Sequence, residues 1–179
     1  MRELLIEKGH TTAVQIHDQI NKMDARIPAN GAKVVTPAWN DPEIKSALLA
    51  DAGQASQNMG FDIGPMNLIA VENTASIHNL FVCTLCSCYP RNLLGLPPNW
   101  YKFRVYRSRT VVEPRRILLE FGVEIAQDVL VCVHDRTADM RCGVLPTQPI
   151  EATGLSEDEL DHWVTRDSMI GVGLPQAPK

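Results

Sequence analysis

The most informative stretch of the sequence is Val82-Cys83-Thr84-Leu85-Cys86-Ser87-Cys88, in which three thiols fall within six residues. Thiolates are soft donors that suit transition metals, so this spacing predicts a metal site. It does not match a zinc ribbon, which needs a second Cys-x-x-Cys knuckle or added histidines. An iron–sulfur site generally needs a fourth cysteine. Only Cys132 or Cys142 can supply it, and only if the segment that carries them folds back.

The Cys86-Ser87-Cys88 spacing allows a more specific arrangement. Two thiolates that flank one residue can share a plane with the intervening backbone nitrogens. If the Ser87 and Cys88 amides deprotonate, they complete an N₂S₂ square, with Cys83 as the axial ligand and a sixth position open. An open position suits a transition metal that acts as a Lewis acid. Spacing alone leaves a structural zinc ion or plain buried thiols as alternatives.

The composition narrows the class of protein. The chain of 179 residues predicts one domain, or one domain with a helical appendage. With 17 basic and 21 acidic residues, its net charge of −4 argues against nucleic acid or an anionic membrane as a partner. Five cysteines are too few, and odd in number, for a disulfide scaffold. The amphipathic start does not resemble a signal peptide, so we expect a cytoplasmic protein.

Helical patterns dominate residues 1–60. Thr11 or Thr12 is expected to cap a helix, and Asp41-Pro42-Glu43 is typical of a helix start. The cluster Pro28-Ala29-Asn30-Gly31 predicts a turn. We therefore predict an N-terminal helical segment over residues 1–60 that packs on a partner.

Strand-like runs appear after residue 61. Residues 68–71 and 80–82 predict strands, and residues 129–133 and 140–145 predict a hairpin. A helix is expected from Glu113 to Gly122, a capping box at Ser156, and a last strand over residues 168–172. Helices followed by a mixed region predict an α+β fold, with a metal-binding domain over residues 61–174 and a disordered tail over residues 175–179.

The heptapeptide resembles the metal-binding claw of nitrile hydratase α subunits, which form a layered α/β domain after an N-terminal helical segment. The resemblance covers nearly the whole chain. Further stretches that carry it include Val71-Glu72-Asn73-Thr74, His78-Asn79, Leu94-Gly95-Leu96-Pro97-Pro98-Asn99-Trp100-Tyr101-Lys102, Glu113-Pro114-Arg115 and Val164-Thr165-Arg166-Asp167.

This resemblance implies roles for the claw residues. Cys83, Cys86, Ser87 and Cys88 are the expected metal ligands, with Cys83 as the axial thiolate and with Ser87 and Cys88 donating amide nitrogens. Cys86 is expected as a sulfinate and Cys88 as a sulfenate, and these two are the expected catalytic residues. Thr84 resembles the cobalt-type members, where iron-type members carry serine. We therefore expect non-corrin Co(III), with Fe(III) as the alternative.

The resemblance also implies an activity and partners. The expected reaction is the hydration of a small-molecule nitrile to its amide, catalysed by a lyase that acts with one or two β-type subunits. An activator protein, or metallochaperone, is expected to load the metal.

Some residues depart from the family pattern and leave alternatives open. Arg91 stands where nitrile hydratases usually carry tryptophan, and it resembles the γ subunit of thiocyanate hydrolase. Its charge predicts a preference for polar or anionic substrates. A three-subunit hydratase of the toyocamycin type, a thiocyanate hydrolase-like subunit and a non-catalytic metal-binding module remain alternative interpretations. His78, Cys132 and Cys142 are interpreted mainly as core residues, and Tyr101 as a core or pocket-wall residue.

Overall fold

The computed structural model describes residues 1–65, 67–83, 88–135 and 139–178. Within these ranges, no helix is long and apolar enough to cross a membrane. The strands are β1 (Asn67–Glu72), β2 (Ile77–Phe81), β3 (Leu130–His134) and β4 (Met140–Leu145). The helices are α1 (Arg2–Glu7), α2 (Ala13–Asp24), α3 (Pro28–Asn40), α4 (Pro42–Ala50), α5 (Ala52–Asn58), α6 (Arg91–Leu94), η1 (Asn99–Lys102), α7 (Arg104–Val112), α8 (Pro114–Glu120), η2 (Ile150–Ala152), α9 (Glu157–Asp161) and α10 (Arg166–Ile170).

Each strand pairs in parallel with a strand that is distant in the sequence, β1 with β4 and β2 with β3. The predicted hairpin over residues 129–133 and 140–145 is therefore wrong, because these strands belong to different sheets. A short polar link between two apolar runs resembles a hairpin, but β3 and β4 instead pair with the earlier strands. In the observed register, Phe81 lies opposite His134 and Val71 opposite Val144.

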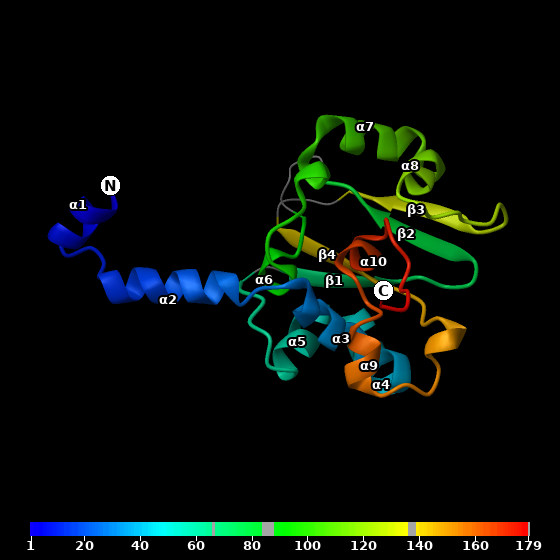
Figure 1. Cartoon of the computed structure of the whole chain (residues 1–179), viewed down its shortest axis with the longest axis horizontal. Coiled ribbons are helices and arrows are strands. Elements are labelled where there is room, and N and C mark those ends of the chain that lie inside the picture. Colours follow the sequence, from blue (N-terminus) through cyan, green and yellow to red (C-terminus); the bar gives the residue numbers. More distant parts are fainter. Residues whose placement is uncertain (66, 84–87, 136–138, 179) are drawn as a thin grey trace.

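Helices cover the strands on several sides (Figure 1). In this view α7 and α8 lie above β3 and β2, whereas α3, α4, α5 and α9 lie below β4 and β1, and α10 lies in front. One cluster of buried residues joins α3, β2, α8 and α10, as shown by Ala32, Leu80, Leu118 and Ile170. The α+β prediction is confirmed by this mixture of helices and small sheets.

Helices α3 to α5 belong to the body of the protein. Their buried residues include Val34, Leu48 and Ala55, which share a core with the strands. Residues of α3 to α5 therefore pack on this chain's own sheets, a contact that the sequence did not predict. The predicted turn at Pro28 is also wrong, because α3 begins there. Proline suits the first position of a helix, where no N–H is needed.

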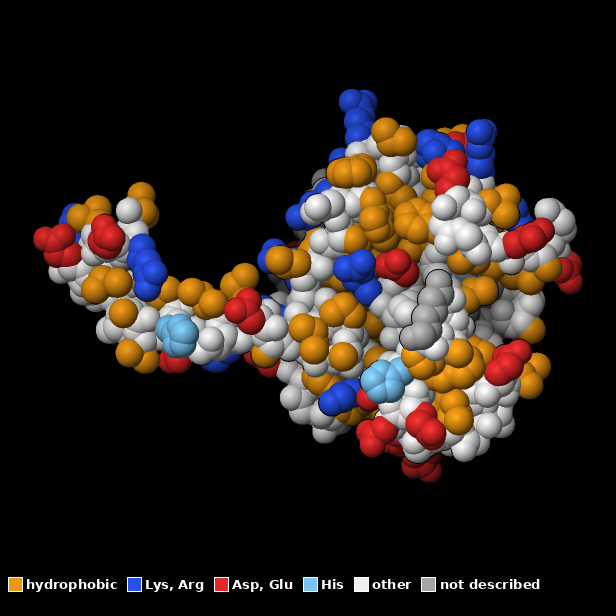
Figure 2. Space-filling view, viewed as in Figure 1, with side chains coloured by type: hydrophobic (Ala, Val, Ile, Leu, Met, Phe, Trp, Pro, Cys, Tyr) orange, Lys and Arg blue, Asp and Glu red, His pale blue; other side chains and the backbone are white. Residues whose placement is uncertain are grey.

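The helices α1 and α2 form an N-terminal arm, residues 1–27, that projects from the body (Figure 1). Neither helix buries a residue. Thr12 caps α2 in a capping box with Gln15, which confirms one of the two predicted caps. Apolar side chains lie along the arm (Figure 2). The exposed large ones are Met1, Leu4, Leu5, Val14, Ile20, Met23 and Ile27.

The C-terminal region corrects one further prediction. Residues 166–170 form helix α10 and not a strand, because Thr165 provides a capping box with Ser168. Gly171 ends this helix with a φ of 94°. At the start of the tail, Pro175 is buried, and the N–H of Gln176 donates to the carbonyl of Trp163 at 3.1 Å. The predicted capping box at Ser156 is confirmed.

Candidate metal centre

Cys83 lies just beyond the end of β2. The N–H of Val82 donates to the carbonyl of His134 at 3.0 Å, so the pairing with β3 extends one residue past the strand. Val82 and Cys83 are fully buried. The first predicted ligand, Cys83, therefore directly follows a buried strand end.

Cys88, at the other end of the loop, lies beside Cys83. Its N–H points to the Cys83 sulfur, with 3.1 Å between Cys88 N and Cys83 Sγ. Its carbonyl accepts the N–H of Cys142, in β4, at 3.0 Å. Cys88 is 1% exposed. The structure therefore brings Cys83 and Cys88 together, while the predicted ligands Cys86 and Ser87, and Thr84, lie outside the described residues.

The Cys88 sulfur has two further polar neighbours. Its Sγ lies 3.4 Å from the hydroxyl of Tyr101 and 3.6 Å from the carbonyl oxygen of Val82. Hydrogen bonding with Cys83 and burial raise the pKa of the Cys88 thiol, and the hydrogen bond with Tyr101 opposes this rise. Without a cation, this environment therefore favours a protonated, neutral sulfur, as expected where a charge is removed from water.

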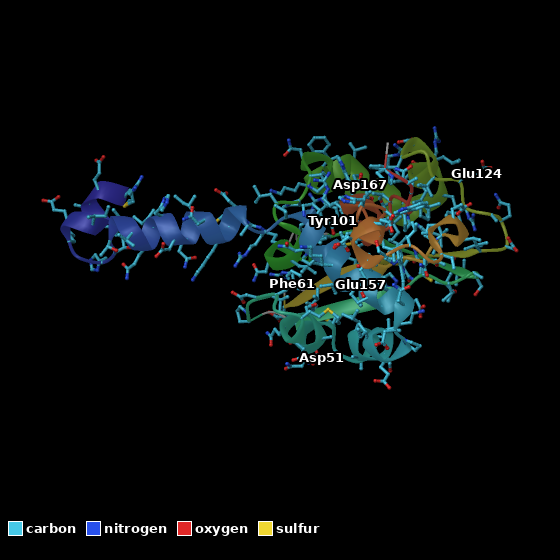
Figure 3. All side chains as sticks on the ribbon, turned by 60° about the horizontal axis from the view of Figure 1, so that its bottom comes forward. Asp51, Phe61, Tyr101, Glu124, Glu157 and Asp167 are labelled. Carbon is cyan, nitrogen blue, oxygen red and sulfur yellow. The ribbon has the colours of Figure 1, made fainter. Side chains whose placement is uncertain are left out.

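Tyr101 belongs to a group of aromatic rings beside Cys88. Figure 3 places it in the body of the protein, away from the arm. Its ring centre lies 5.5 Å from that of Tyr89 and 5.9 Å from those of Trp100 and Tyr106. The hydroxyl of Tyr106 donates to the carbonyl of Phe81 at 2.9 Å. The pKa of Tyr101 is raised, first by burial and then by the nearby Cys88.

The position of Tyr101 beside the sulfur was missed from the sequence, which predicted a core or pocket-wall residue. It lies thirteen residues from Cys88, in the short helix η1. No spacing rule links a tyrosine at that distance to a cysteine. Its place in the Leu94–Lys102 stretch, which carries the family resemblance, was the one available signal.

A buried polar network supports the strand end that carries Cys83. The Nε2 of His78 lies 2.7 Å from the carbonyl oxygen of Gly171, so this nitrogen donates. The Nδ1 of His78 then accepts from the Asn73 amide at 3.4 Å. The Oδ1 of Asn73 accepts the N–H of Asn79 at 2.7 Å, and the Oδ1 of Asn79 lies 2.8 Å from Nε2 of His134.

His78 is therefore a core residue, as interpreted from the sequence, since it is 4% exposed. Burial lowers its pKa, while the hydrogen bond to Gly171 raises it to a smaller extent. The neutral ring is favoured because its two nitrogens are matched to one acceptor and one donor. The network orders β2 just before the claw begins.

Within the described residues, Cys132 and Cys142 form no three-ligand group with Cys83 and Cys88. Cys142 is buried in β4, and Cys132 is partly exposed in β3. Among the described residues, no three His, Cys, Asp or Glu side chains lie close enough to hold an ion. Cys142 contributes its backbone N–H to the loop, and the described geometry gives it no part in a three-residue site.

A pocket of about 360 Å³ lies beside the claw. Pro90 and Arg91, which follow Cys88 closely in sequence, line one side of it, and Arg141 of β4 also lines it. The end of the arm contributes Asp24 and Arg26. Three guanidinium groups and one carboxylate therefore border a pocket that also has apolar walls.

Comparison with known proteins identifies relatives of this chain. Residues 1–173 match the family described as nitrile hydratase, alpha chain. The chain is 43% identical to the low-molecular weight cobalt-containing nitrile hydratase subunit alpha of Rhodococcus rhodochrous, over 99% of this chain and 87% of the relative. It is 46% identical to the cobalt-containing nitrile hydratase subunit alpha of Pseudonocardia thermophila, over 96% and 86%.

Solved structures agree with these sequence relatives. A recombinant thiocyanate hydrolase with partially modified cobalt centres has a TM-score of 0.90 and 36% identity, over 98% of this chain and 86% of the other. A mutant Fe-type nitrile hydratase from Comamonas testosteroni has a TM-score of 0.88 and 36% identity over the same shares. This chain belongs to the nitrile hydratase alpha-chain family.

Proposed function

We propose that this chain is the metal-carrying subunit of a nitrile hydratase, a lyase that hydrates a nitrile to the corresponding amide. The main support is the match of residues 1–173 to the nitrile hydratase alpha chain, together with relatives named as cobalt-containing subunits. The buried, converging ends of the Cys83–Cys88 loop are the structural observation that supports it.

The donors of the site are Cys83, Cys86, Ser87 and Cys88. These residues would hold the ion through thiolate sulfurs and backbone nitrogens. The N–H of Cys88 donates to the Cys83 sulfur at 3.1 Å, so the two residues already lie together at one point. Cys83 and Cys88 are both buried, which suits thiolates that a cation neutralises. The roles of Cys86 and Ser87 rest on the family resemblance.

Cobalt is the proposed metal, as non-corrin Co(III). The names of the relatives from Rhodococcus rhodochrous and Pseudonocardia thermophila support cobalt, as does the resemblance of Thr84 to cobalt-type members. An Fe-type enzyme among the similar structures keeps Fe(III) as the alternative.

The bound ion supplies Lewis-acid chemistry, either by polarising the nitrile or by activating a water. The protein residues hold and adjust the reacting groups. Cys88, as a sulfenate, provides an oxygen that acts as nucleophile or as base, and Cys86 is a sulfinate. Buried anionic sulfur groups require hydrogen-bond donors, so we expect arginines from a β-type subunit to pair with them. An activator protein loads the metal, and the complex is cytoplasmic.

Arg91 supports a second candidate substrate class, polar or anionic molecules such as thiocyanate. It lines the pocket beside the claw together with Arg141 and Arg26. An excess of cations at a pocket favours polar or anionic substrates, and thiocyanate hydrolase is among the structural relatives. In the Arg91→Trp variant, we expect activity to move towards apolar nitriles. An unchanged preference between apolar and polar nitriles would remove this candidate.

The Cys88→Ala variant tests the catalytic proposal against a non-catalytic metal-binding module. We expect turnover of nitriles to be lost while the complex with the β-type subunit still folds. Retained turnover would contradict the claw mechanism. Tetrahedral zinc with three unoxidised cysteines in the mature complex would instead identify a structural site.

A further inference from the structure

The hydroxyl of Tyr101 is a side-chain donor that lies beside the Cys88 sulfur. The two atoms are 3.4 Å apart, within the range of a hydrogen bond to sulfur, and both residues are at most 2% exposed. We propose that Tyr101 is a positioning residue of the metal centre, whose hydroxyl donates a hydrogen bond to the sulfur group of Cys88. This inference rests on the proposed function, because it takes Cys88 to be a metal ligand.

The direction of the hydrogen bond follows from the chemistry of a ligating sulfur. A metal-bound thiolate, or its oxidised form, carries no proton and can only accept. A tyrosine hydroxyl can donate. The carbonyl of Val82, another neighbour of the sulfur, is an acceptor and cannot stabilise an anionic sulfur. The Cys83 thiol also hydrogen-bonds with Cys88, but as a ligating thiolate it has no proton to donate. Tyr101 is thus the group that matches the sulfur once the metal is bound.

The surrounding rings hold the Tyr101 hydroxyl in place. Trp100, Tyr106 and Tyr89 pack edge-on or tilted around its ring. Trp100 is itself packed on Phe121, with ring centres 4.7 Å apart. A side chain fixed in this way loses little further freedom when it forms a hydrogen bond, so the bond can orient Cys88 rather than merely follow it.

The neighbouring tyrosines do not share this role. The Tyr106 hydroxyl is used by the carbonyl of Phe81 at 2.9 Å. The Tyr89 hydroxyl is buried and has no hydrogen-bond partner within the part of the chain that the structure describes. Tyr106 is 5% exposed and packs in the same group of rings as Tyr101. It therefore provides a matched control for removal of one buried hydroxyl.

A hydrogen bond to a ligating sulfur affects the electronic structure of the centre. It stabilises the electrons on sulfur, which raises the energy needed to move one of them to the metal. Removing the bond should therefore shift the sulfur-to-metal charge-transfer absorption to longer wavelength. Partners that hydrogen-bond to metal ligands typically change activity or affinity about 10–100-fold when they are mutated.

The test compares the wild-type holoenzyme with the Tyr101→Phe and Tyr106→Phe variants, each produced with its β-type partner and cobalt. We expect Tyr101→Phe to shift the charge-transfer band to longer wavelength and to lower kcat about 10–100-fold, with a smaller change in KM. Tyr106→Phe should leave the band in place, even if it lowers stability. Replacement of Tyr101 by 3-fluorotyrosine keeps the size and strengthens the donor, so it should shift the band to shorter wavelength.

The outcomes separate this inference from the proposed function. If the wild type carries cobalt and its band does not move in Tyr101→Phe or in the fluorotyrosine protein, the inference is wrong and the proposed function stands. Equal shifts in Tyr101→Phe and Tyr106→Phe would also overturn it, because they would indicate a general effect of the core. A wild type that carries no cobalt and hydrates no nitrile would overturn both proposals.

Discussion

The arm and the strand end that carries Cys83 differ in what holds them. In the arm, residues 1–27, helices α1 and α2 bury no residue, although α2 has a complete capping box. Around β2, by contrast, Leu80, Phe81 and Val82 are at most 2% exposed and lie between elements from distant parts of the sequence. The arm therefore depends on local interactions and the strand end on tertiary packing.

This difference separates two kinds of sequence information. Caps and helical spacing determine where a helix begins, and they do so in the arm without a core. They do not determine what the helix packs against, because an isolated helix of this length is marginal in water. The apolar side chains left exposed on the arm make it a candidate surface for a partner subunit, whereas the body already has its own core.

The largest contrast is expected between two glycines with left-handed backbone. At Gly171, which has a φ of 94°, a Cβ would lie 2.0 Å from the carbonyl oxygen of Asn79. Gly171→Ala combines this overlap with backbone strain, so we expect a loss of about 3–5 kcal/mol in the free energy of unfolding. Gly9 in the arm has a φ of 70° and no atom within 4 Å of such a Cβ.

Denaturant unfolding of both variants checks this prediction. Gly9→Ala should leave the unfolding of the body unchanged, because its strain stays within the arm. An equal loss in the two variants would show that the arm and the body unfold as one unit, contrary to the comparison.

A second contrast concerns apolar side chains. Leu80 is fully buried, and Ile20 in α2 is 45% exposed. Leu80→Ala should lower the free energy of unfolding by about 2–5 kcal/mol, since it leaves a cavity. Ile20→Ala should change it by less than about 0.5 kcal/mol. Thermal unfolding measures both, and a similar large effect at Ile20 would mean that the arm packs on the body.

Protonation of His78 should destabilise the body at acidic pH. Burial lowers the pKa of His78 from its ordinary 6.5, so the unfolded chain binds this proton more readily than the folded one. The stabilisation is present above pH 6.5 and is lost as the pH falls from there towards the lowered pKa, at up to about 1.4 kcal/mol per pH unit. His78→Gln should flatten this part of the pH dependence.

Urea unfolding at several pH values between 7.5 and 5 measures the effect. His17→Gln, at an exposed position in the arm, serves as the control for the removal of one imidazole. An identical pH dependence in His78→Gln and wild type would show that His78 does not contribute.

The smallest contrast concerns two threonine hydroxyls. The buried Thr36 donates to Asp161 at 2.7 Å and links α3 to α9. Thr36→Val keeps the shape and should cost about 1–2 kcal/mol of unfolding free energy, because Asp161 loses a partner. Thr11→Val removes an exposed hydrogen bond to Gln15 in the arm and should cost less than about 0.5 kcal/mol. Calorimetry of the two variants distinguishes these values.

The starts of helices were predictable from the sequence where a single capping residue or proline determines them. Asp41 accepts the N–H of Glu43 as the predicted cap of α4, and Pro114 begins α8 as expected. The pairing of β3 and β4 was not predictable, since short apolar runs do not encode which distant strand lies beside them. The packing of residues 28–60 was also missed, because a helical pattern reveals an apolar face but not its partner.

The site was predictable only in part, for a similar reason. The spacing of the cysteines indicates that Cys83 and Cys88 approach one another, and the structure places Cys88 N 3.1 Å from Cys83 Sγ. Tyr101 and the carbonyl of Val82 reach the Cys88 sulfur through tertiary packing. The spacing of these residues in the sequence predicts neither contact.

Native mass spectrometry of the chain purified with its β-type partner tests the central claim most directly. The account predicts one cobalt per chain and three added oxygens on the Cys83–Cys88 peptide, two on Cys86 and one on Cys88. Zinc with unmodified cysteines in an otherwise intact complex would contradict it.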